Sequence, residues 1–227
     1  MWRAFCGCCA TGRDLPAEYP SGVTCWRRLR QWEEVGIGKG AWEHLLAHLN
    51  QRQLLDWNEV FLDATLITAK KGALQWAQPG VERAQSTWWW SDGQGIPLGV
   101  QLASASPSEH SLAEGTLAQV RVPRLGRGRP RTRLPRVIAD RGYDSDALRQ
   151  RLRQRGTELI VSYRSNSVLR RFEDRRKLRR YRRRWKIERA FAWLQNLRRL
   201  LVRHDRILTV YQGFFHLACL IITLRHL

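Results

Sequence analysis

Three acidic residues in apolar or basic surroundings are the candidates for chemistry: Asp63, Asp140 and Glu188. Asp63 interrupts the apolar run V-F-L-D-A-T-L-I-T, where a buried carboxylate is costly unless it is paired or binds a metal. Asp140 ends R-V-I-A-D, where a strand gives way to a loop, and ligand-binding groups of open α/β sheets gather at such ends. Carboxylates from separate elements suit Mg²⁺ or Mn²⁺, which prefer oxygen ligands.

The chemistry that such a site would perform is phosphodiester cleavage and transfer. Two metal ions about 3.5–4 Å apart activate a water or a 3′-hydroxyl and stabilise the leaving oxygen. The segment around Glu188 supports this interpretation, because helical spacing aligns four polar residues on one face: Tyr181, Arg184, Glu188 and Gln195. Arg184 is a candidate for binding the scissile phosphate or for orienting Glu188.

Each of the three acids also has a plain structural interpretation when it is taken alone. Asp63 could cap a turn, Asp140 could be a satisfied loop acid, and Glu188 could be the i,i+4 partner of Arg184. Their combination in one chain favours the metal site.

The elements that must position these residues alternate between strands and helices. We expect a strand over 58–71, a hairpin turning at residues 92–95, a short helix over 108–120, and strands at 136–140 and 158–163. A helix capped by Asp144 or Ser145 should end at Gly156. We expect a long basic helix over 177–206, whose apolar face packs on the sheet, and a last apolar helix over 210–227. That apolar face consists of Ile187, Ala190, Phe191, Leu194 and Leu201.

The first 55 residues favour two helices, separated by Gly36, Gly38 and Gly40. The whole pattern predicts an α/β sandwich around a mixed sheet.

The charge balance predicts a polyanionic partner. Among 227 residues, 40 Lys and Arg face 20 Asp and Glu, which gives a formal net charge of +20 and a pI near 11.2. Nucleic acid is the commonest such partner. The excess is concentrated in an exposed loop over 123–135 and in R-R-K-L-R-R-Y-R-R-R, although such runs can also be solvated faces or a product of codon bias. The DNA-contact candidates are Arg129, Arg131, Arg133, Arg141, Arg180, Arg182, Arg183, Lys186, Arg198 and Arg199.

Cysteine usage and hydropathy argue against other classes of protein. Five cysteines, three of them in C-G-C-C at residues 6–9, form neither a paired disulfide pattern nor a zinc motif and favour a reducing compartment. The longest apolar stretch, F-F-H-L-A-C-L-I-I-T-L, is roughly half the ~20 residues that a membrane span needs. We interpret it as a core helix.

Several segments together resemble the DDE transposases of bacterial insertion sequences. They are D-A-T within an apolar strand, V-I-A-D-R-G-Y-D-S, and Y-R-R-R-W-K-I-E-R-A-F-A-W-L-Q-N-L-R-R-L, with further likeness in W-R-R-L-R-Q-W-E-E and F-F-H-L-A. The likeness covers most of the chain.

The resemblance implies an RNase H-like α/β fold, a mixed sheet flanked by helices, with a short helical region over 1–55 and a catalytic domain over 56–227. It implies that Asp63, Asp140 and Glu188 hold two Mg²⁺ or Mn²⁺ ions, with Tyr181 and Arg184 as the accessory pair of a Y-R-E-K signature. The expected reaction is nicking at transposon ends, followed by attack of the freed 3′-hydroxyl on target DNA. The resemblance further implies a homodimer on DNA and a cytoplasmic, nucleoid-associated location. It implies no small-molecule cofactor and no membrane.

Three departures from the family pattern bear on this expectation. Gln195 stands where the signature has Lys, and the helical region that precedes G-R-D-L-P is shorter than in relatives, which suggests a truncation. Residues 81–91, V-E-R-A-Q-S-T-W-W-W-S, make a poor aliphatic strand. Three Trp codons shifted by one base read as Val codons, so we hypothesise a short out-of-frame patch, which the gene's neighbouring frame would confirm or refute. The alternative is an aromatic patch that stacks on bases.

Three functions remain open from the sequence. The chain is an active or formerly active transposase, a related RNase H-like nuclease that cuts without strand transfer, or a DNA-binding remnant without catalysis.

Overall fold

A mixed sheet forms the centre of the protein. The computed structural model describes residues 18–69, 84–104, 115–163 and 174–227. In these residues the strand order is β3-β2-β1-β4-β5, and a short β6 pairs with the far end of β1. The antiparallel half contains β1 (Val60–Ala69), β2 (Ala84–Ser91) and β3 (Pro97–Ser104). In the other half, β4 (Arg136–Ala139) and β5 (Glu158–Ile160) run parallel to β1.

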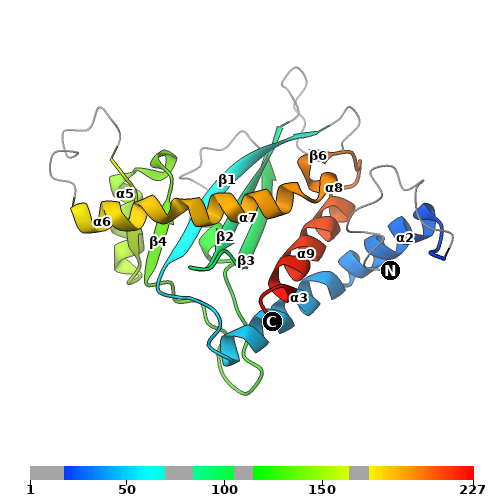
Figure 1. Ribbon diagram of the computed structural model, residues 1–227, viewed down its shortest axis with the longest axis horizontal. Coiled ribbons are helices and arrows are strands. Elements are labelled where there is room, and N and C mark those ends of the chain that lie inside the picture. Colours follow the sequence, from blue (N-terminus) through cyan, green and yellow to red (C-terminus); the bar gives the residue numbers. More distant parts are fainter. Residues whose placement is uncertain (1–17, 70–83, 105–114, 164–173) are drawn as a thin grey trace.

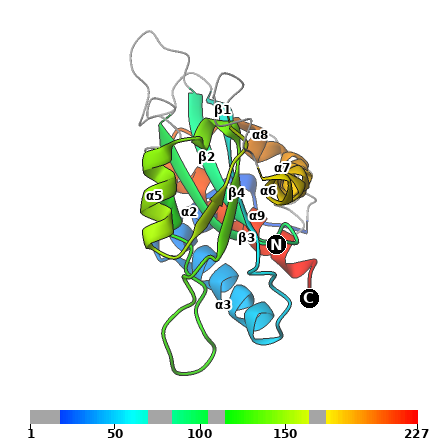
Figure 2. The ribbon, with the colours of Figure 1, turned by 90° about the vertical axis from the view of Figure 1, so that its left-hand side faces the viewer.

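Helices cover both faces of this sheet. In Figure 2, α5 (Asp146–Gln154) lies on one side, and the run of α6 (Arg175–Tyr181), η3 (Arg182–Arg184) and α7 (Trp185–Gln195) lies on the other. Figure 1 shows this run crossing in front of β4 and β1. The predicted α/β architecture, a mixed sheet flanked by helices, is confirmed.

Three further helices form a layer beside β3. The two N-terminal helices, α2 (Gly22–Glu34) and α3 (Ile37–Gln51), both pack against α9 (Leu208–Leu224), which also contacts β3. A hydrogen bond between the half-buried side chains of Glu33 and His216, with 2.9 Å between carboxylate and Nδ1, joins α2 to α9. The predicted core helix is thus α9, and in the part of the chain that the structure describes no helix is long and apolar enough to cross a membrane.

The structure confirms most of the predictions that rest on residues at the ends of helices and strands. Ser145 caps α5 by accepting a hydrogen bond from the Leu148 amide, and Gly156 follows that helix with a φ of +74°. The predicted hairpin is confirmed, since β2 and β3 pair across residues 92–96. Residues 108–114 of the predicted short helix lie outside the described residues. Residues 123–135 form the expected loop, and a bridge between Val122 and Arg131 closes its first part.

Three predictions about helices were wrong. The basic segment 177–206 is not one helix, because the 3-10 turn η3 interrupts it and it continues beyond α7 as a short α8 (Arg198–Leu201) and β6 (Val202–Arg203). The backbone is extended at Leu197, which ends the helical phase, so Leu201 is 45% exposed and does not pack on the sheet. Gly38 and Gly40 lie within α3, and only Gly36, with a φ of +77°, separates the two N-terminal helices.

The tryptophan patch lies in strand β2, between β1 and β3. Trp88, Trp89 and Trp90 are between 0% and 1% exposed, although their indole N–H groups have no hydrogen-bond partner among the described residues. Because no ring reaches the surface, the alternative of base stacking is wrong. The hypothesis of an out-of-frame patch remains a question for the gene sequence.

The β2–β3 turn is built around a buried carboxylate. Asp92 is 0% exposed and accepts hydrogen bonds from the amides of Asp56, Gln94 and Ile96. Burial nevertheless dominates and raises the pKa of Asp92 to about 6. At Gly93 a Cβ atom would stand 2.0 Å from a carboxylate oxygen of Asp56, so only glycine fits there.

The burial of the tryptophans gives a first testable prediction. Trp89→Ala should lower the free energy of unfolding by about 3–5 kcal/mol, because it opens a large cavity between the sheet and its covering helices. Trp185→Ala is the matched control, since Trp185 is 51% exposed, and it should change stability by less than about 0.5 kcal/mol. Urea unfolding followed by circular dichroism measures both. Equal effects would mean that β2 is not buried.

The turn gives a second prediction, on pH. The pKa of Asp92 is higher in the fold than its ordinary 3.8, so its stabilising contribution is complete below that pH and is lost as the pH rises through about 6. The Asp92→Asn variant should therefore become more stable relative to the parent as the pH rises, by up to about 3 kcal/mol between pH 4 and pH 7. Thermal unfolding at matched ionic strength tests this, with Asp146→Asn at an exposed site as the control. A difference that does not vary with pH would contradict it.

Candidate active site

The pairing of β1 with β4 brings two of the three candidate acids together. The two strands run parallel, and Leu62 stands opposite Ala139, so Asp63 and Asp140 occupy the next positions on neighbouring strands. Asp63 belongs to β1, whereas Asp140 follows β4 and precedes a 3-10 turn (Arg141–Tyr143). Asp140 thus lies at the carboxyl end of a parallel strand, as predicted.

Arg184 holds both carboxylates with one guanidinium group. Its Nη1 atom donates to Oδ1 of Asp140 at 2.5 Å and its Nη2 atom donates to Oδ2 of Asp63 at 3.1 Å. The Tyr181 hydroxyl donates to the same Asp140 oxygen at 3.3 Å and accepts from Arg184 Nη1. Four of the five predicted catalytic residues therefore form one hydrogen-bonded cluster.

The electrostatics of this cluster reflect partial burial. The Asp63 side chain is 18% exposed, and burial raises its pKa; Arg184 and the Ala64 amide oppose this effect, and the nearby Asp140 adds to it. Burial lowers the pKa of Arg184, but its contacts with Tyr181, Asp63 and Asp140 outweigh burial and raise it. Arg184 is therefore the cation that allows two carboxylates to stand together at neutral pH.

Glu188 is not gathered into this cluster. It lies in the first turn of α7 with an exposed side chain. Among the described residues, no three His, Cys, Asp or Glu side chains lie close enough together to hold a metal ion. The 3-10 turn at 182–184 contributes to this separation, because three residues at about 120° each, instead of about 100°, rotate Glu188 by roughly 60° relative to Tyr181. The side chain of Gln195 lies outside the described residues.

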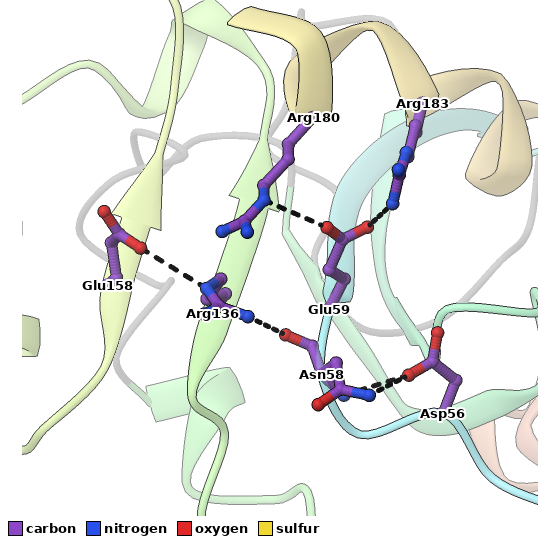
Figure 3. A network of polar contacts seen from close by, with 7 residues as sticks. All are labelled: Asp56, Asn58, Glu59, Arg136, Glu158, Arg180 and Arg183. Carbon is purple, nitrogen blue, oxygen red and sulfur yellow. Dashed lines mark hydrogen bonds and ion pairs between the residues drawn. The ribbon is translucent and has the colours of Figure 1, made fainter. Parts of the chain in front are cut away.

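The predicted DNA-contact residues fall into two groups. Some have partners within the protein: Arg180 and Arg183 pair with Glu59, Lys186 donates to the Gly93 carbonyl, Arg199 lies 3.8 Å from Asp205, and the Arg131 guanidinium stacks over Trp57. Figure 3 shows the contacts of Arg180 and Arg183. Others, Arg129, Arg133, Arg141 and Arg182, have exposed side chains, and the side chain of Arg198 lies outside the described residues.

Two buried acids near this site escaped the sequence reasoning: Glu59 and Asp92. Glu59 stands in W-N-E-V, one residue before the apolar strand, and the neighbouring sequence does not indicate that its partners lie in α6 and η3. Asp92 in D-G-Q-G was interpreted only as a turn residue. An acid directly before an apolar strand was the available signal for Glu59.

Comparison with known proteins places these observations in a family. The family model described as "Transposase DDE domain" matches residues 58–223. A protein of Burkholderia cepacia, "Putative transposase for insertion sequence element IS402", is 36% identical over 133 residues, or 58% of this chain and 59% of that protein. A second B. cepacia protein, "Insertion element IS402 uncharacterized 16.2 kDa protein", is 46% identical over 59 residues, which are 25% of this chain and 40% of that protein. The matches thus span less than two thirds of the length of these relatives.

Solved structures show only a distant likeness. The piggyBac transposase synaptic complex with hairpin DNA has a TM-score of 0.48 at 9% identity, over 73% of this chain and 46% of that one. The catalytic domain of Mos1 mariner transposase has a TM-score of 0.32 at 14% identity, over 92% of this chain and 97% of that one. Neither likeness bears on the chemistry of this chain.

The shared guanidinium gives a third prediction. Arg184→Gln should destabilise the protein by about 2 kcal/mol at pH 7, because Asp63 and Asp140 lose their common cation. The pKa of Asp63, which is already raised, should rise further, so the cost should be smaller at pH 4 than at pH 7, because the carboxyl takes up a proton as the pH falls. Arg182→Gln, two residues earlier in the chain and exposed, is the control and should have little effect. An Arg184→Gln cost that is the same at both pH values would refute the bridging role.

Proposed function

Because the chain belongs to the family of transposase DDE domains, we propose that it cleaves DNA at transposon ends and joins the freed 3′-hydroxyl to target DNA in a reaction that depends on divalent metal ions. The observation that carries this proposal is the convergence of Asp63 and Asp140 on one guanidinium group. Two carboxylates from neighbouring strands, at the carboxyl end of β4, are the arrangement that a cation site requires.

The donor set of this cluster fits Mg²⁺ or Mn²⁺. Asp63 and Asp140 supply oxygen ligands and already neutralise a shared cation, Arg184. We propose that Asp63, Asp140 and Glu188 hold the metal, two ions at a complete site, after α7 brings Glu188 toward the other two. When bound, the metal ions supply an activated water or 3′-hydroxyl and stabilise the leaving oxygen.

The side chains around the carboxylates have separate tasks in this proposal. The Tyr181 hydroxyl, bonded to Oδ1 of Asp140, holds that carboxylate in one orientation. Arg184, when it releases the carboxylates, presents two parallel N–H groups that match a phosphate. The exposed cations Arg141 and Arg182 adjoin the cluster in sequence and are our first candidates for contacts with the DNA backbone; Arg129, Arg133 and Arg198 follow them.

We propose DNA as the partner, bound by a homodimer that brings two ends together, in the cytoplasm at the nucleoid. The net charge of +20 supports the DNA partner. Two alternatives remain, a nuclease without strand transfer and a DNA-binding remnant. The exposed position of Glu188 favours the remnant if α7 does not move.

A nicking and joining assay tests this proposal and separates the alternatives. With Mg²⁺ and terminal-repeat DNA, the parent should nick and join, and Asp140→Asn should reduce both by roughly a hundredfold or more. Asp146→Asn, at an exposed acid in the same region, should react like the parent. Cutting without joining would indicate the nuclease, and salt-sensitive binding without cutting would indicate the remnant.

A further inference from the structure

Glu59 is a buried acid whose contacts all point to the segment that carries Arg184. The residue is 5% exposed and directly precedes β1. Its two carboxylate oxygens are divided between two arginines: Oε1 lies 3.4 Å from Nε of Arg180, and Oε2 accepts a hydrogen bond from Nη1 of Arg183 at 3.0 Å. Figure 3 shows this clamp from close by.

The two arginines alternate in sequence with the two residues of the candidate active site. Arg180 precedes Tyr181, and Arg183 precedes Arg184. Residues three apart share one face of a helical segment, so the pair 180 and 183 defines one face and the pair 181 and 184 the adjacent face. A carboxylate that fixes the first face therefore fixes the rotation of the second about the helix axis.

The same strand presents both sets of contacts. Residues 59, 61 and 63 alternate along extended chain and so face one side. Each of them meets the run of helices: Glu59 at Arg180 and Arg183, the Phe61 ring at Lys186 Nζ, and Asp63 at Arg184. Glu59 thus sets the position of this run relative to Asp63 from a point roughly 13 Å away along the strand.

We propose that Glu59 is a positioning residue, which holds the turn at 180–184 so that Arg184 and Tyr181 reach Asp63 and Asp140. The significance of this placement for catalysis rests on the proposed function. A second acid, Glu158, pairs with Lys177 of α6 and with Arg136, but these side chains are between 34% and 51% exposed, so this contact should contribute little. Glu158, which lies in β5 and pairs with the same helix, is therefore the control.

The test measures the coupling between Arg184 and Asp140 in the presence and absence of the Glu59 charge. Urea unfolding is measured for the parent, Arg184→Gln, Asp140→Asn and the double variant. The coupling is the factor by which Arg184→Gln changes the unfolding equilibrium constant of the parent, divided by the factor by which it changes that of Asp140→Asn. We expect this ratio to be about tenfold. In the Glu59→Gln background the ratio should fall below about twofold, whereas in the Glu158→Gln background it should remain about tenfold.

A purely structural role for Glu59 predicts a different result. Glu59→Gln would then lower the stability of all four proteins equally and leave the ratio about tenfold, which would overturn the proposal. If Glu59→Gln does not fold, Arg183→Gln removes one half of the clamp at a side chain that is 52% exposed, and it should reduce the ratio severalfold. An unchanged ratio there would overturn the proposal equally.

This measurement needs neither DNA nor metal, so it stands apart from the proposed function. If the parent does not nick DNA, the coupling still decides the role of Glu59. If it does, Glu59→Gln should lower kcat about tenfold without raising KM for DNA, because no cation is removed from the surface. A raised KM with unchanged kcat would instead assign the clamp to DNA binding.

Discussion

The fold depends on placing the Asp63 carboxylate in the middle of its central strand. Such a group is unfavourable in an apolar sheet unless a cation pairs with it. In the part of the chain that the structure describes, that cation is Arg184, from the run α6 to α7. The pairing of β1 with β4 places a second carboxylate, that of Asp140, beside the first, so the same cation must pair with both. The position of the covering helices is therefore set by charge as well as by apolar packing.

This requirement divides the arginine-rich segment into two kinds of residue. Arg180 and Arg183 face Glu59, and Arg184 faces the aspartates, so these three hold the segment on the sheet. Arg182, which lies between them, is exposed. A run of like charges in the sequence thus contains both docking residues and surface residues, and alternation around the helix axis separates them.

Local signals predicted the strands and the two aspartates well, because a carboxylate inside V-F-L-D-A-T or at the end of R-V-I-A-D contrasts with its neighbours. The break at 182–184 and the short strand β6 could not be predicted, since R-R-R-W-K continues a helical pattern and only pairing with β1 makes residues 202–203 a strand. Glu59 was missed because its partners are distant in sequence. The burial of the tryptophans depended on strand order, which composition does not reveal.

The hydrogen bond between Glu33 and His216 joins helices that lie far apart in the sequence, which has a consequence for the order in which the chain can fold. Helices α2 and α3 are made before the helix on which both pack, α9, which lies more than 150 residues later in the chain. Until then the apolar faces of α3 and β3 have no cover, and long-range contacts of this kind slow folding. Until α9 has been made, the growing chain therefore exposes the apolar surface that α9 covers in the folded protein.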